Sequence, residues 1–224
     1  MDLPRDNDLY FACIDLHGRA CTVVGAGPVA LEKITSLMAA GADIIVVAPE
    51  AIQEIRDLAR GGAIEWRAKS YENGDLDGAF LAIVATGDDE VARRVYVDAE
   101  ERRLLINVAD VPELCSFILP AVVREGSIAV AISTAGASPA LAQKLRDEIG
   151  ALLKRPYSAL ARVLHDLRPW AKQALPTYEA RKEFFSGLVN GDPDPISLIE
   201  AGKVDELNLV IAGARRRASQ VIDP

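Results

Sequence analysis

The sequence predicts an α/β fold in which a doubly wound parallel sheet is followed by a region of helices. Two observations predict this class. Short β-branched apolar runs alternate with segments of helical spacing over about the first 110 residues, whereas from residue 157 onward the spacing is helical with breaks at prolines and glycines. Strands that alternate with helices pair in parallel, because each helix returns the chain to the same edge of the sheet.

The composition is that of an ordinary globular protein and excludes several classes. The chain has 224 residues, of which 50% are hydrophobic and 26% charged, and its net charge of -8 disfavours nucleic-acid binding. We found no apolar run of membrane-spanning length and no signal peptide, so we expect a cytoplasmic protein without a membrane partner. Cys13, Cys21 and Cys115 lack metal-site spacing and predict reduced thiols. Because His17 and His165 lie far apart, we expect no metal site of the usual zinc kind.

Hydrophobic periodicity assigns the individual elements. Runs rich in Val and Ile predict strands over residues 10–16, 21–24, 43–48, 63–68, 80–85, 104–109, 116–123 and 127–133. The first two of these strands predict a hairpin, because His17-Gly18-Arg19 forms a turn signal between them. Apolar residues at three- and four-residue spacing predict helices over residues 29–40, 51–60, 90–103 and 139–153. Asp88 and Ser138 are suitable caps for the last two helices, and further helices follow from residue 157.

A glycine motif lies between the strand that begins at Cys21 and the helix that follows it. Gly25 permits a tight turn, and Gly27 leaves space for a pyrophosphate to approach the backbone. Pro28 suits a first helical turn, and the small Ala30 lets that helix pack close to the sheet. This order predicts a Rossmann-type dinucleotide site at the helix N-terminus. The alternative is a glycine turn that binds no ligand.

Further cofactor contacts are expected where the next strands end. Glu50 follows the second strand, where an acidic residue often binds the ribose hydroxyls, although Pro49 intervenes. Glu50 is alternatively part of the first turn of the following helix, in which case the backbone at Pro49 and Glu50 makes the contact. Thr86 ends another strand at the same edge. No arginine follows Glu50 directly to bind a 2′-phosphate, which favours NAD over NADP.

Asp110 is the candidate catalytic residue. It ends a strand at the sheet edge that also carries Gly25, Gly27 and Thr86, where a carboxylate can act as a general base. The alternative is a structural carboxylate that caps a turn before Pro112.

A candidate substrate site precedes the predicted helix at residue 139. The loop carries Ser133, Thr134, Gly136 and Ser138, whose hydroxyls and small size suit a carboxylate or phosphate. The alternative is a capped helix start with incidental serines. Lys144 is a candidate cationic contact for an acidic substrate. The other candidate cations of this region are Arg124, Arg146, Lys154 and Arg155.

Five motifs together resemble one family. They are GAGPVA at 25–30, AT at 85–86, NVAD at 107–110, SFILP at 116–120 and STAGASPA at 133–140. This combination resembles the precorrin-2 dehydrogenase family, which includes the N-terminal module of siroheme synthase and a yeast bifunctional dehydrogenase and ferrochelatase. The resemblance covers about residues 8–155. The chain departs from the family loop at Thr134, Ala135 and Ala137.

The resemblance implies an activity and a division of the chain. It implies oxidation of precorrin-2 to sirohydrochlorin with NAD⁺ in siroheme or cobalamin biosynthesis, and in some members insertion of Fe²⁺ or Co²⁺ as well. It implies that Asp110 is catalytic, and that the NAD contacts include Pro28, Val29, Pro49 and Glu50. Asn107 and Val108, in the same motif as Asp110, are further candidate cofactor contacts. The resemblance further implies a homodimer, with an NAD-binding domain over residues 1–113, a dimerisation region over 114–153 and a C-terminal helical domain over 154–224.

Three other functions remain open from the sequence. The first is a different NAD-dependent oxidoreductase on the same fold. The second is a non-catalytic NAD-sensing module, and the third is a chelatase that no longer uses its dinucleotide site.

Overall fold

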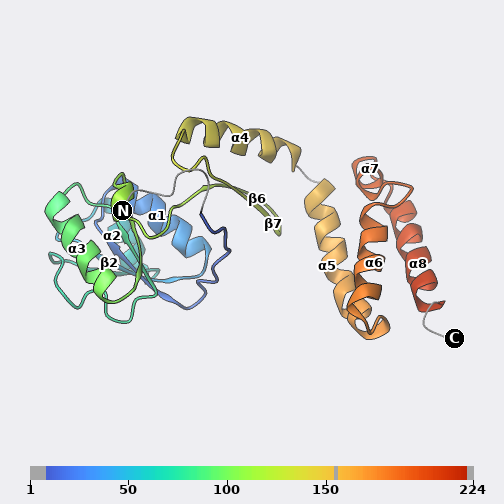
Figure 1. The fold of residues 1–224 in the computed structure, drawn as a ribbon, viewed down its shortest axis with the longest axis horizontal. Helices are drawn as coiled ribbons and strands as arrows, with labels where there is room; N and C mark the ends of the chain where they lie inside the picture. Colours follow the sequence, from blue (N-terminus) through green and yellow to red (C-terminus); the bar gives the residue numbers. More distant parts are fainter. Residues whose placement is uncertain (1–8, 154–155, 221–224) are drawn as a thin grey trace. The chain divides into compact units, whose positions relative to one another are not determined.

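A computed structural model describes residues 9–153 and 156–220 of the chain (Figure 1). The described residues form two compact units that divide between Leu119 and Pro120. The three-part division expected from the sequence stays a prediction.

The first unit is a five-stranded parallel sheet with the strand order β3-β2-β1-β4-β5. Its strands are β1 (Ala20–Val24), β2 (Asp43–Val47), β3 (Glu65–Arg67), β4 (Leu81–Val84) and β5 (Leu105–Val108). Its helices are α1 (Pro28–Ala39), α2 (Gln53–Arg60), α3 (Asp89–Glu101) and the short 3-10 helix η1 (Pro112–Leu114). The chain builds outward from β1 in both directions, so the topological switch point lies between β1 and β4.

Alternate residues of the strands pack on opposite faces of the sheet. Val23 and Ile83 lie in one core cluster with Ile34 of α1 and Ile55 of α2. The neighbouring residues Val24 and Val84 lie in a second cluster with Val95 of α3. Because both faces are covered, the central strands β1 and β4 are apolar on both faces except at Thr22 of β1. The predicted Rossmann-type doubly wound sheet is confirmed (Figure 1).

The strand expected over residues 10–16 is wrong. Residues 9–16 have no strand partner, and the side chains of Tyr10 and Phe11 are 93% and 52% exposed. Asp15 instead organises a turn, since its carboxylate accepts from the His17 N–H and its carbonyl accepts from the Arg19 side chain. An apolar run with no neighbouring strand to satisfy its backbone does not form a strand.

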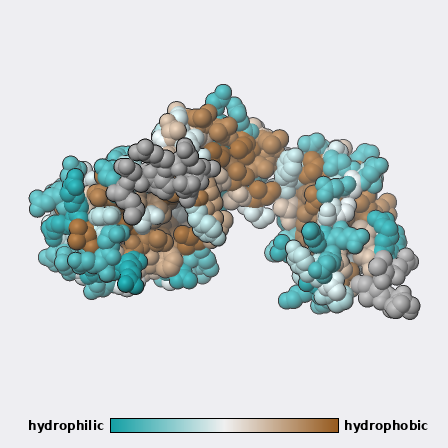
Figure 2. All heavy atoms as spheres, viewed as in Figure 1, coloured by the Kyte–Doolittle hydropathy of each residue, from teal (hydrophilic) through white to brown (hydrophobic). Residues whose placement is uncertain are grey.

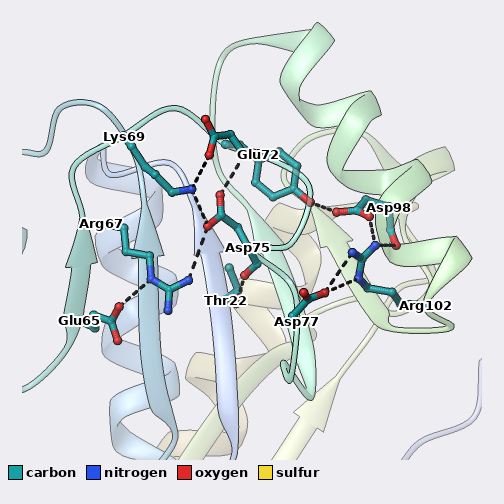
Figure 3. A network of polar contacts seen from close by, with 10 residues as sticks. Thr22, Glu65, Arg67, Lys69, Glu72, Asp75, Asp77, Asp98 and Arg102 are labelled. Carbon is teal, nitrogen blue, oxygen red and sulfur yellow. Dashed lines mark hydrogen bonds and ion pairs between the residues drawn. The ribbon is translucent and has the colours of Figure 1, made fainter.

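The connection from β3 to β4 has no helix, and polar contacts hold it against the sheet (Figure 3). Asp75 is buried and forms ion pairs with Lys69 at 3.0 Å and Arg67 at 3.5 Å, while its carbonyl accepts from Thr22. Tyr71 donates to the buried Asp98, which also pairs with Arg102, the C-cap residue of α3. These charges are compatible with burial because each has a partner.

Replacement of Tyr71 by Phe is expected to lower the free energy of unfolding by about 1–2 kcal/mol, because the buried Asp98 carboxylate loses one hydrogen bond. Burial raises the pKa of Tyr71 to about 12, so the hydroxyl remains a donor at neutral pH. Urea denaturation measures the change. Tyr178→Phe, at a side chain that is 67% exposed, is the control and should change stability by less than about 0.5 kcal/mol.

The second unit begins with a hairpin that packs against one helix. Strands β6 (Ala121–Glu125) and β7 (Ile128–Ile132) pair antiparallel, and α4 (Pro139–Leu152) covers one face of the pair. Gly150 allows this close packing, because a Cβ there would lie 3.2 Å from Val123. The strand expected over 116–123 starts later and runs through Arg124 and Glu125, since a two-residue loop with Gly126 at φ +58° makes the turn.

The remaining helices pack on each other as the sequence predicts. They are α5 (Pro156–Ala174), α6 (Tyr178–Val189), α7 (Pro195–Glu200) and α8 (Val204–Gln220). Phe184 and Leu188 of α6 are buried in one cluster with Leu167 and Ala171 of α5. Thr177 and Asp194 cap α6 and α7. The predicted helical C-terminal region is therefore confirmed.

Candidate active site

Three neighbouring strands end at the edge of the sheet where the sequence places the site. Backbone hydrogen bonds continue beyond the strands and hold the following residues side by side. These bonds join Gly25 N to Val47 O at 3.0 Å, Ala85 N to Val24 O at 2.8 Å and Ala109 N to Val84 O at 2.9 Å. The glycine turn, Thr86 and the Asp110 turn consequently follow strands that are neighbours in the order β1-β4-β5.

Gly25 is required by the backbone geometry of the turn. Its φ is +110°, a value that residues with a Cβ rarely adopt, and a Cβ there would lie 2.2 Å from the Ala85 carbonyl oxygen. The turn after β1 is therefore packed directly against the backbone that follows β4.

The residues around Gly27 fit a dinucleotide pyrophosphate. A Cβ on Gly27 would meet no described atom within 4 Å, so open space lies above this residue. Gly27 is also the N-cap of α1, where no side chain caps the helix and no acidic residue stands in the first turn. The free N–H groups at this end, together with the helix dipole, favour an anion. Pro28 and Val29 are exposed beside it.

Pro49 and Glu50 are exposed directly after β2. The expected alternative, that Glu50 belongs to the first turn of the next helix, is wrong because α2 begins at Gln53. A hydrogen bond from Ile52 N to Ala26 O at 3.0 Å ties this loop to the glycine turn. The arrangement leaves the Glu50 carboxylate available, and its contact with the ribose stays a prediction.

Thr86 lies half-buried after β4, and its hydroxyl accepts from the Asp88 N–H at 3.2 Å. Asp88 caps α3 as the sequence predicts, since its carboxylate accepts from the N–H groups of Glu90 and Val91. A contact of Thr86 with the cofactor stays a prediction.

Asp110 is exposed in the turn that follows β5. The turn is closed by Val111 N and Val108 O at 3.3 Å, and Asp110 occupies its third position with φ +61°. Asp is one of the few residues that tolerate this left-handed conformation. Among the described residues, its carboxylate takes part in no hydrogen bond or ion pair, which is not the pattern of a capping residue.

The two residues expected beside Asp110 are turned inward. Val108 is buried, and Asn107 is 8% exposed with its amide donating to Phe117 O at 3.0 Å and to Cys115 Sγ at 3.6 Å. Asn107 thus holds the loop behind β5, and its role toward the cofactor stays a prediction. The sequence reasoning treated Cys115 only as a reduced thiol and missed its contacts with Asn107 and Val108, which no local pattern indicates.

Local hydrogen bonds organise the Ser133–Ser138 loop. Thr134 Oγ1 accepts from Ser138 N at 3.1 Å and donates to Ser138 O, while Ser138 Oγ caps α4 by accepting from Leu141 N at 3.2 Å. Ser133 Oγ accepts from Ala135 N at 3.1 Å, and Gly136 is exposed at φ +84°. The capped-helix interpretation explains the hydroxyls, and a substrate contact stays a prediction.

The cations proposed for substrate binding are partly neutralised. Lys144 lies 3.5 Å from Glu148 on the exposed face of α4, and Arg146 pairs with Asp147 at 2.8 Å. Arg124 is exposed on the hairpin face opposite α4. Lys154 and Arg155 lie outside the described residues. Exposed ion pairs such as these are weak and can exchange for a ligand carboxylate.

Two features are absent from residues 9–153 and 156–220, a membrane-spanning helix and a cluster of metal-ligating side chains. None of the helices there has the length and hydropathy needed to cross a membrane. No group of three or more His, Cys, Asp or Glu side chains is arranged to bind a metal ion within this part of the chain.

Comparison with known proteins agrees with this geometry. A family model described as NAD(P)-binding matches residues 12–121, and one described as the central part of a sirohaem biosynthesis protein matches residues 125–152. A siroheme synthase of Thioalkalivibrio sulfidiphilus is 39% identical over 82% of this chain and 38% of its own length. A siroheme synthase of Methylococcus capsulatus is 36% identical over 92% of this chain and 43% of its own length. The chain therefore spans about two fifths of these relatives.

A solved structure is matched over nearly its whole length. SirC, a precorrin-2 dehydrogenase, is 26% identical with a TM-score of 0.73, and the match covers 89% of this chain and 99% of SirC. The structural match agrees with the fold described above, and the first family model agrees with a dinucleotide-binding domain over the parallel sheet. The chain belongs to the precorrin-2 dehydrogenase family and carries that family's NAD-binding domain.

Proposed function

We propose that the chain catalyses the NAD-dependent dehydrogenation of precorrin-2 to sirohydrochlorin in siroheme biosynthesis. One observation carries the proposal: an uncapped helix N-terminus and a carboxylate without a partner among the described residues follow strands of the same three-strand edge. The choice of precorrin-2 as substrate rests on the similar proteins, since SirC is a precorrin-2 dehydrogenase and the longer relatives are siroheme synthases.

The reaction removes a hydride and a proton from the substrate, and different residues serve the two transfers. NAD⁺, when bound, supplies the acceptor for the hydride that the reduced macrocycle loses. Gly25, Gly27 and the first turn of α1 bind the pyrophosphate and orient the dinucleotide. A proton must leave the substrate as well, and the Asp110 carboxylate accepts it as a general base. The Ser133–Ser138 loop and Lys144 contribute to binding of the acidic substrate.

An assay with precorrin-2 separates this proposal from its alternatives. The protein is incubated with precorrin-2 and NAD⁺, and the spectra of sirohydrochlorin and NADH are followed together. We expect both products to form in equal amounts, and only when NAD⁺ is present. Binding of NAD⁺ without turnover would support the sensing module, and turnover of other reduced substrates alone would support a different oxidoreductase.

Insertion of Fe²⁺ or Co²⁺ into sirohydrochlorin is a second candidate activity. It is favoured by Asp110, because the same exposed carboxylate is suited to accept pyrrole protons. Adding either metal ion to the completed reaction tests it. A faster spectral change than in the protein-free control is the expected result, and equal rates would exclude this activity.

We also propose that the protein is a homodimer whose interface includes the free face of the hairpin. Val122, Ala129 and Ala131 are exposed on the face opposite α4, and Leu141 of α4 is 48% exposed. Figure 2 shows hydrophobic residues gathered over this part of the chain. A lone two-stranded sheet is marginally stable in water, so a second copy of the same surface is a suitable cover.

The Val122→Lys variant is expected to shift the protein from dimer to monomer, because it replaces the apolar contact of Val122 by a second cation beside Arg124 on the same face. Light scattering after size-exclusion chromatography measures the mass. Val97→Lys is the matched control, since Val97 is 55% exposed on α3 in the other unit, and it should leave the dimer intact. A wild-type protein that is already monomeric at micromolar concentration would contradict the proposal.

A further inference from the structure

We propose that Cys115 is a positioning residue whose thiol holds the turn that carries Asp110. This inference rests on the proposed catalytic role of Asp110. Cys115 is not among the residues proposed above to contact the dinucleotide or the substrate.

The thiol lies at the centre of a hydrogen-bond cluster around the turn. Cys115 Sγ accepts from Val108 N at 3.2 Å, and its proton has two carbonyl acceptors, Val108 O at 3.3 Å and Val111 O at 3.4 Å. Val108 and Val111 are the first and last residues of the turn, so one sulfur atom contacts both of its ends. The Asn107 amide adds a contact at 3.6 Å.

The sulfur also completes an unpaired sheet edge. β5 is the outer strand of the sheet, and the N–H and carbonyl groups of Ile106 and Val108 have no strand beside them. Ser116 provides hydrogen-bond partners for both backbone groups of Ile106. Its hydroxyl accepts from Ile106 N at 2.8 Å, and its own N–H donates to Ile106 O. Cys115 does the same for Val108, which is the residue next to the turn. The loop therefore takes the place of a sixth strand, and its Cys115 thiol contacts both ends of the turn that carries Asp110.

Asp110 needs such support because of its conformation. At φ +61° the backbone lies in the left-handed region, which Asp tolerates but which is not its preferred conformation, and the exposed Asp110 side chain has no described partner to hold it. The helix η1 brings Cys115 under the turn through Leu114 N to Val111 O at 3.0 Å and Cys115 N to Pro112 O at 3.1 Å. Burial raises the pKa of Cys115, so the thiol keeps the proton that it donates.

The variants Cys115→Ala, Cys115→Ser and Ser116→Ala test the proposal in the full chain. Cys115→Ala is expected to lower kcat by about tenfold with little change in the KM for NAD⁺, since a misplacement of about 1 Å in a catalytic group can cost about 10²-fold. Cys115→Ser keeps a donor and an acceptor and should recover most of the rate. Ser116→Ala is the matched control, because it removes the equivalent edge contact from Ile106 and should leave kcat within twofold.

A double variant separates positioning from general destabilisation. In the Asp110→Asn background, Cys115→Ala should cost less than twofold, because the group that it positions is already absent. Equal losses in both backgrounds, or a wild-type kcat for Cys115→Ala, would overturn the proposal.

Amide hydrogen exchange gives a readout that does not depend on activity. The N–H groups of Val108 and Val111 should exchange at least tenfold faster in Cys115→Ala than in Ser116→Ala. Unchanged exchange at both residues would refute the support of the turn by the thiol. A wild-type chain that shows no turnover of precorrin-2 would instead refute the proposed function, and the exchange result would still decide whether the thiol holds the turn.

Discussion

Replacement of Asp110 by Asn is expected to lower kcat for precorrin-2 dehydrogenation by about 10²–10⁴-fold, the usual contribution of a general base. Asn is the informative substitution because it tolerates the left-handed φ of +61° and has nearly the same shape as Asp. The backbone of the turn is thereby preserved, and only the proton acceptor is removed. Formation of sirohydrochlorin measured at saturating NAD⁺ and precorrin-2 reports the change.

A neighbouring carboxylate provides the control for Asp110. Glu113 is exposed in η1, so Glu113→Gln removes the same charge three residues away without touching the turn. We expect this variant to retain at least half of the wild-type kcat. Binding of NAD⁺ to Asp110→Asn should also remain within twofold of wild type, because the pyrophosphate site is formed by other residues. Full turnover by Asp110→Asn would remove Asp110 from the mechanism and leave the fold and the NAD site unaffected.

The two motif glycines are expected to respond differently to the same substitution. Gly25→Ala should lower the free energy of unfolding by about 3 kcal/mol or more, because a Cβ at φ +110° would lie 2.2 Å from the Ala85 carbonyl oxygen. That oxygen belongs to the backbone of the neighbouring strand end and cannot move without disturbing β4. Thermal or urea denaturation measures the loss.

Gly27→Ala should fold with nearly unchanged stability and fail to bind the dinucleotide. A Cβ at Gly27 meets no described atom within 4 Å, so the folded protein accommodates it. The same methyl group would occupy the space through which a pyrophosphate reaches the N–H groups of α1. We expect the Kd for NAD⁺ to rise at least tenfold, measured by calorimetry, together with a free energy of unfolding within about 0.5 kcal/mol of wild type.

A matched control for both glycine variants is Gly62→Ala. Gly62 follows α2 at φ +72° with no described atom within 4 Å of a Cβ, so it tests backbone strain without a clash and away from the site. It should lower stability by about 1–2 kcal/mol and leave NAD⁺ binding unchanged. Tight NAD⁺ binding by Gly27→Ala would place the cofactor elsewhere.

Much of the candidate site could be predicted because its parts are local. The strand, Gly25, Gly27 and the start of the helix lie within thirteen consecutive residues, 21–33. The spacing of the apolar residues changes there from that of a strand to that of a helix. Asp110 was located by the same reasoning, because a parallel strand that ends in a carboxylate places that group at the carboxyl edge. Caps such as Asp88 and Ser138 were also predictable, since a cap contacts N–H groups only two or three residues away.

Contacts between distant segments were not predictable from periodicity. The apolar run over 10–16 resembles a strand, but whether it becomes one depends on a neighbour that the sequence does not reveal. Asn107 lies in the motif that points to the cofactor, yet its amide contacts the loop at Phe117. Cys115 resembles an ordinary packed cysteine until the fold places its sulfur beside both ends of the Asp110 turn.

The sequence by itself determined the fold class, the dinucleotide turn and the carboxylate at the sheet edge, because each depends on the spacing of nearby residues. Only the tertiary structure decided why Gly25 cannot be replaced, which side chains complete the edge of β5, and that the Asp110 carboxylate has no described partner. The physical reason is that these properties depend on which strands are neighbours. The backbone oxygen of Ala85, just after β4, limits the turn after β1, and the sulfur of a later loop accepts from the last N–H of β5.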